Sequence, residues 1–91
     1  MRDLAASDVS RYLEVDPFGD LRWRVDRRGN AKAGDIAGAI HRQGHRVVRL
    51  MGHLYAAKTL AWAIHHGAWP DGDVRFREGK LNVHKHNLYE A

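Results

Sequence analysis

The chain has 91 residues, no cysteine and a formal net charge of +4. Its length suits one small domain with a modest core, and the missing cysteines exclude disulfides, iron–sulfur clusters, thiolate zinc sites and thiol catalysis. No segment approaches the roughly 20 apolar residues of a membrane span, and no long apolar run follows the first basic residue as in a signal peptide. We therefore expect a single domain of the cytoplasm with no membrane partner.

Residues 1–20 are predicted to form a helix and a turn. In ASDVSRYLEV (6–15), three apolar side chains recur at the spacing of one helical face. Ser7 is the candidate N-cap, and Asp8 suits the first turn because the N-terminus of a helix favours negative charge. The following DPFGD (16–20) predicts a turn, since proline biases the preceding residue away from helix and glycine tolerates turn geometry.

A strand and a long connection are expected next. LRWRV (21–25) alternates apolar and basic side chains, which is the pattern of a half-buried strand. Residues 26–44 are rich in glycine and charge but poor in apolar anchors. We therefore predict a mostly irregular connection, of the kind that often carries function.

The middle of the chain predicts a hairpin and a helix. HRVVRL (45–50) and HLY (53–55) flank a tight Met-Gly turn and are expected to form two strands. AAKTLAWAIHHG (56–67) has an apolar stripe at helical spacing and ends in glycine, as helices often do. Residues 21–67 are thus predicted to form a three-stranded antiparallel sheet packed on a helix, in an α+β fold.

The last quarter of the chain, residues 68–91, contains shorter signals. WPDG predicts a turn, VRF (74–76) a short strand, EGK a second turn, and NVHKHNLYEA (82–91) a short terminal helix or turn. No internal repeat and no domain boundary interrupts the sequence. We expect one domain that spans residues 1–91.

Basic charge is concentrated in the middle of the chain. Residues 21–58 contain nine basic and two acidic side chains, whereas residues 1–20 contain two basic and five acidic ones. Such a local surplus is the electrostatic footprint of a protein that binds a polyanion. A solvated basic face that only aids solubility is the alternative interpretation.

Several motifs in order resemble the small phage and prophage HNH homing-type endonucleases, from about Val15 to the end of the chain. That family is a sheet-and-helix unit followed by a ββα-metal finger, so the resemblance implies the same fold with residues 68–91 as the finger. The motifs that carry it are DPFGDLRW, AGDIAG, the hairpin GHRVVRLMGHLY, LAW, GAWPDG and the final Asn-Leu pair.

The resemblance also implies which residues should be catalytic. Family members hold one divalent metal with an Asp of an Asp-His pair and a late Asn, while the His deprotonates the attacking water. In this sequence the Asp position is Arg75, the His position is Phe76, and the late Asn is Asn87. A guanidinium repels a cation and a phenyl ring accepts no proton. We therefore expect a degenerate finger without catalytic residues, metal or cofactor.

His84 and His86 keep an enzymatic alternative open. Histidine is a common transition-metal ligand, and an i, i+2 pair shares one face if the local chain is a strand. In a helix or a turn these positions do not face each other, and nearby Lys85 disfavours a bound cation. We therefore expect solvated or phosphate-contacting histidines, with residual metal-dependent DNA nicking as the alternative.

The expected function is non-catalytic binding of duplex DNA through a basic sheet face. The alternative is a phage-encoded inhibitor of a host defence complex, of the anti-CRISPR type, that acts by protein–protein binding in the host cytoplasm. The three tryptophans are expected to pack in the core. The residues expected to contact nucleic acid or a partner protein are Arg22, Arg24, Arg27, Arg28, Lys32, Arg46, Arg49 and Lys58.

Overall fold

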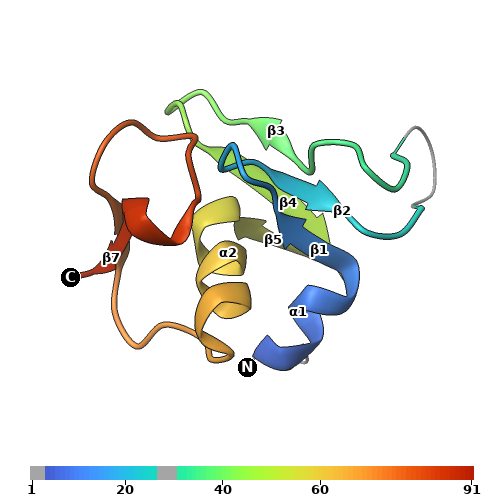
Figure 1. Cartoon of the computed structure of the whole chain (residues 1–91), viewed down its shortest axis with the longest axis horizontal. Coiled ribbons are helices and arrows are strands. Elements are labelled where there is room, and N and C mark those ends of the chain that lie inside the picture. Colours follow the sequence, from blue (N-terminus) through green and yellow to red (C-terminus); the bar gives the residue numbers. More distant parts are fainter. Residues whose placement is uncertain (1–3, 27–30) are drawn as a thin grey trace.

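The computed structural model describes residues 4–26 and 31–91, which form an α+β fold with several small antiparallel sheets. Figure 1 shows α2 between α1 on one side and the C-terminal β6–β7 pair on the other, and α2 contacts both sides. In chain order the elements are α1 (Ala6–Tyr12), β1 (Leu13–Val15), β2 (Leu21–Trp23), β3 (Ala39–Ile40), β4 (Arg46–Leu50), β5 (His53–Ala56), α2 (Ala57–His66), β6 (Val74–Phe76), the 3₁₀ turn η1 (Lys85–Asn87) and β7 (Leu88–Glu90).

Helix α1 begins earlier and ends earlier than its sequence pattern predicts. Its N-cap is Ala5, which makes no side-chain capping bond, so the prediction of Ser7 as N-cap is wrong. Burial of Ala6 against the core favours an earlier start. Leu13 is fully buried but has extended backbone angles, because it pairs as a strand residue. The predicted apolar face is therefore inward, although its last residues belong to β1.

Strands β1 and β2 form their own two-stranded sheet around the turn at residues 16–20. Leu13 pairs with Trp23, and both are buried. The predicted three-stranded sheet, which placed LRWRV beside the later hairpin, is therefore wrong: the three-stranded sheet has the order β3–β4–β5. A short turn closes the β1–β2 hairpin at small entropic cost, whereas alternation within a strand does not identify its partner.

The β4–β5 hairpin confirms the prediction for the middle of the chain. Met51 and Gly52 have φ values of 52° and 82°, as a type I′ turn requires. β3 was not predicted and lies within the segment expected to be irregular. Gly38 permits it, because a Cβ at this position would lie 2.3 Å from the carbonyl oxygen of Val47 on β4.

Helix α2 and its glycine stop are also confirmed. Gly67 has a φ of 68° and ends the helix in the left-handed conformation, and Leu60 and Ala61 are fully buried.

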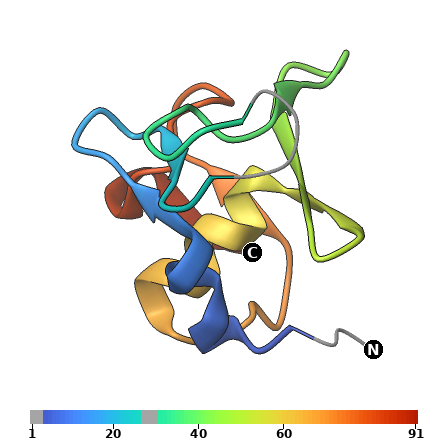
Figure 2. The ribbon, with the colours of Figure 1, turned by 90° about the vertical axis from the view of Figure 1, so that its right-hand side faces the viewer.

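Figures 1 and 2 both show α1 at the end of the molecule opposite the loop of residues 31–44. In the described ranges, no helix is long and apolar enough to cross a lipid bilayer. The largest fully buried side chains are Leu13, Leu21, Leu50, Leu60, Val9 and Val48.

The C-terminal segment differs from its predicted form. The strand at VRF is confirmed as β6. The expected short helix or turn is present only as the 3₁₀ turn η1, and the chain after η1 forms β7, which pairs antiparallel with β6. Leu88 is buried opposite Phe76, so pairing with β6 covers an apolar side chain that a short isolated helix would leave exposed. Residues 74–90 therefore have the order strand, 3₁₀ turn, strand, and a ββα finger is not seen in them.

Candidate functional site

Arg22, the first of the predicted binding residues, is held by the turn that precedes its strand. Its Nε donates to Asp16 Oδ2 at 2.6 Å, and its Nη1 donates to the Gly34 carbonyl at 2.7 Å. The bond to Asp16 is the main cause of the raised pKa of Arg22. Burial raises the pKa of the Asp16 carboxyl, but the bonds from Arg22 and from two backbone N–H groups of the turn outweigh burial and lower that pKa. The positive charge of Arg22 is therefore balanced by Asp16, and its guanidinium links the turn at residues 16–20 to Gly34.

Arg24 and Arg46 each donate to a backbone carbonyl instead of a carboxylate. Arg24 Nη1 donates to the carbonyl of Ser10, and Arg46 Nη1 donates to that of Gly38 at 3.4 Å. A carbonyl positions a guanidinium without neutralising its charge. Arg24 is exposed and Arg46 is half-buried, so both contribute positive potential at the surface.

The other predicted contacts lie on separate elements. Arg49 is exposed on β4, and Lys32 is exposed in the loop before β3. Lys58, at the start of α2, is half-buried with its Nζ 3.9 Å from Asp73 Oδ1. Arg24 follows the end of β2, and β2 and β4 belong to different sheets, so Arg24 does not share one continuous sheet with Arg49. Two further predicted residues lie outside the described ranges, Arg27 and Arg28.

Strand β6 carries the two residues at the expected metal-ligand and base positions. Arg75 is exposed, and its Nε donates to Asp73 Oδ2 at 3.1 Å. Phe76 packs against the core, and Lys58 Nζ lies 5.8 Å from its ring centroid. Neither side chain offers an electron pair to a divalent metal ion. The positive charges of Arg75 and Lys58 also repel such an ion. The residues at this site therefore do not fit the metal that the family resemblance implies.

Asn87 uses its whole amide to hold the loop between β6 and β7. Its Oδ1 accepts from the Glu78 N–H at 2.9 Å, while its Nδ2 donates to the carbonyls of Glu78 and Asn82, both at 2.8 Å. These three bonds join the two ends of the loop across residues 78–87. The predicted late Asn is thus a structural clamp in this chain.

His84 and His86 lie at the start of η1 with their rings stacked. The ring centroids are 5.1 Å apart, and the His86 N–H donates to His84 Nδ1 at 3.4 Å. Across residues 4–26 and 31–91, no group of three or more His, Cys, Asp or Glu side chains could hold a metal ion. The histidine pair borders the two hollows described next.

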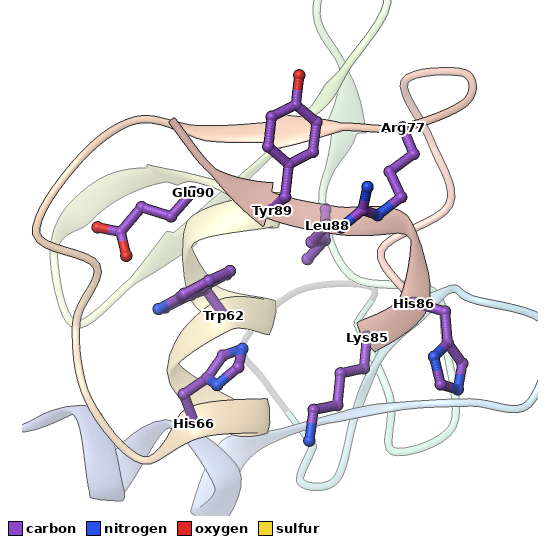
Figure 3. Close-up of a pocket in the computed structure, with 8 residues that line it drawn as sticks. All are labelled: Trp62, His66, Arg77, Lys85, His86, Leu88, Tyr89 and Glu90. Carbon is purple, nitrogen blue, oxygen red and sulfur yellow. The ribbon is translucent and has the colours of Figure 1, made fainter.

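An open groove of about 600 Å³ separates α2 from the C-terminal strand. Figure 3 shows Trp62 and His66 projecting from α2 on one side, with Lys85 and β7 on the other. The two α2 rings lie 4.0 Å apart between centroids. A second hollow of about 330 Å³ adjoins the groove and shares Arg77 and His86 with it. The residues that line the groove are Trp62, His66, Arg77, Lys85, His86, Leu88, Tyr89 and Glu90.

The charged residues that line the groove are two cations, Arg77 and Lys85, and one carboxylate, Glu90. Arg77 lies over the ring of Tyr89, with its guanidinium carbon 5.1 Å from the ring centroid, and Lys85 is exposed. The acidic lining residue is Glu90, whose Oε2 accepts from the backbone N–H of Gly72. Figure 3 places Glu90 at the opposite end of the groove from Arg77. A negatively charged ligand is therefore expected to bind at the end of the groove near Arg77 and Lys85, away from the carboxylate.

The groove was not predicted, because it joins residues 62–66 with residues 77–90. The sequence indicated that His65 and His66 only end a helix, but His65 Nε2 donates to the Val83 carbonyl at 3.0 Å and ties α2 to the loop before η1. Burial, the main cause, lowers the pKa of His65, so the imidazole is a neutral donor at pH 7. The core prediction holds for Trp23, which is buried, whereas Trp62 is only partly buried and lines the groove.

The similarity to HNH endonucleases depends on the ordered motifs of the sequence. A ββα order is not seen among the described residues of the C-terminal segment. The family assignment therefore stays a prediction. Comparison of the chain with protein-family models, with curated proteins and with solved structures found no match.

Proposed function

We propose that this chain is a non-catalytic protein that binds duplex DNA. Binding is supported by five basic residues in the middle of the chain. Among the described residues, none of the five has a carboxylate within 4.0 Å of its charged group. The ion pairs of this region involve Arg22 and Lys58. Cations without a carboxylate partner remain available to phosphates. They are Arg24, Lys32, Arg42, Arg46 and Arg49.

The non-catalytic half of the proposal rests on the clamp and on strand β6. The side-chain amide of Asn87 is bonded to the backbone through its nitrogen and its oxygen. Arg75 puts a fixed positive charge at the position where the HNH family has a metal ligand. A nuclease of the HNH type needs a metal to stabilise the leaving oxygen and a base to activate water. The proposal is therefore binding without strand cleavage.

Duplex binding is expected to depend steeply on salt. If six phosphates are contacted, log K falls against log salt with a slope of about −5. Arg49→Gln is expected to weaken binding and to reduce this slope by about one unit, because Arg49 is an exposed cation on β4. The measurement is fluorescence anisotropy of a labelled duplex, titrated with protein at several salt concentrations.

Arg11→Gln is the matched control, since Arg11 is exposed on α1 and lies 3.8 Å from Asp8. The control removes the same charge from a paired site and is expected to leave the slope unchanged. Equal effects of both substitutions, or no duplex binding at about 50 mM salt, would remove the proposal. A stoichiometric protein complex pulled from host lysate and resistant to nuclease treatment would then favour the inhibitor alternative.

A plasmid-nicking assay tests the catalytic half. With Mg²⁺, Mn²⁺, Ni²⁺ or Zn²⁺ in turn, supercoiled plasmid is expected to remain intact at protein concentrations that retard it in a gel. Nicking that disappears in His84→Ala would show that the histidine pair supplies a catalytic group. That outcome would replace binding by metal-dependent cleavage as the function.

A further inference from the structure

The groove beside α2 and its neighbouring hollow lie next to each other and are together called the path. They share two lining residues, Arg77 and His86, and their combined lining includes Trp62 on α2 and Asn82 in the loop before η1. A single small ligand would occupy one hollow, whereas a linear chain is long enough to occupy two neighbouring ones. The lining therefore fits an extended polymer better than a metabolite.

The lining combines positive charge with aromatic faces. Arg77, Lys85 and the stacked His84–His86 pair provide groups that bind phosphate. Trp62, partly exposed at the groove and backed by His66, provides an aromatic surface. A cationic channel with aromatic side chains is the arrangement that binds single-stranded nucleic acid, because the phosphates meet cations while an unpaired base stacks on a ring.

We propose that this path binds a single strand of nucleic acid. The backbone passes Lys85, Arg77 and His86, and one unpaired base stacks in the groove at Trp62 and His66. The bases of a duplex are stacked on each other, so a duplex cannot supply this contact. The site lies on residues 62–90 and goes beyond the duplex contacts proposed for residues 24–49.

Lys85→Gln provides the first test. With a labelled oligothymidylate of about 12 nucleotides, this substitution is expected to weaken binding about five- to tenfold at about 50 mM salt. Lys80→Gln is the matched control, because Lys80 is an exposed cation on the same loop whose Nζ donates to the Gln43 carbonyl, away from the groove. The control is expected to change binding by less than about twofold.

Tryptophan fluorescence gives a second readout of the same site. Oligothymidylate is expected to quench the emission of the unmodified chain, and Trp62→Phe is expected to remove most of the change. This substitution keeps an aromatic ring against the core, and Trp23 and Trp69 remain as internal references, the latter with its Nε1 bonded to the Leu4 carbonyl. Circular dichroism confirms that each variant is folded.

Three outcomes would overturn the groove assignment. They are no oligothymidylate binding at about 50 mM salt, equal losses in the Lys85 and Lys80 variants, and a polyglutamate peptide that competes as well as the oligonucleotide. Measuring the duplex affinity of the variants distinguishes this inference from the proposed function. Lys85→Gln is expected to spare duplex affinity while Arg49→Gln lowers it, so either site can fail while the other stands.

Discussion

Replacement of Asp16 by alanine is expected to lower the free energy of unfolding by about 2 kcal/mol. The carboxylate accepts from Arg22 Nε at 2.6 Å and from the backbone N–H groups of Phe18 and Asp20, both at 2.9 Å. Its side chain is only 11% exposed, so water replaces these bonds poorly. Chemical denaturation at neutral pH, followed by tryptophan fluorescence, measures the loss.

Asp8→Ala is the matched control for this prediction. Asp8 also pairs with an arginine, Arg11, but at 3.8 Å and with both side chains more than 40% exposed. Exposed pairs contribute between zero and about 1 kcal/mol. If the Asp8 and Asp16 variants lose equal stability, the turn at residues 16–20 is not held by its carboxylate.

Acid should abolish the contribution of Asp16. The pKa of this carboxyl is lower in the folded chain than its ordinary value, so the stabilisation is complete above the unfolded value near 3.9. It is lost as pH falls through the folded pKa, because protonation removes the charge that Arg22 and the amides bind. The stability difference between the original chain and Asp16→Asn is therefore expected to shrink between about pH 5 and pH 2. A difference that stays constant over this range would contradict the assignment.

The sequence predicted those elements that depend on local signals. The Met51–Gly52 turn and the Gly67 stop each use a backbone conformation that glycine favours, and the β4–β5 hairpin and α2 follow from them. Partner choice was not predictable in the same way. The LRWRV pattern fits a strand beside β1 as well as one beside β4, and the difference depends on closure of the intervening turn.

The candidate site shows the same division. The sequence identified the basic residues but could not show that Arg22 is bound to Asp16, because that bond depends on the conformation of the DPFGD turn. It also could not place Lys85 opposite Trp62, since the groove exists only after β7 pairs with β6 beside α2. The sequence shows which residues are charged, but only the fold shows which of those charges are already paired within the molecule.

Asn87→Asp is expected to destabilise the chain by about 3 kcal/mol, although the two side chains have nearly the same shape. The amide Nδ2 donates to two carbonyls at 2.8 Å, and a carboxylate would lose both bonds and place a negative charge against both oxygens. The variant is expected to unfold at lower denaturant concentration at pH 7. Below about pH 4, protonation restores one donor, so part of the stability should return.

Asn82→Asp makes the same chemical change in the same loop and is the control. Asn82 uses its Oδ1 to accept from the His84 N–H at 2.9 Å, and a carboxylate oxygen serves that bond equally well. This variant is expected to change stability by less than about 0.5 kcal/mol. Because the clamp also positions the loop that carries Arg77, Lys85 and His86, Asn87→Asp should also weaken oligothymidylate binding. Retention of both stability and oligonucleotide affinity in Asn87→Asp would mean that the three bonds of Asn87 do not hold the groove together.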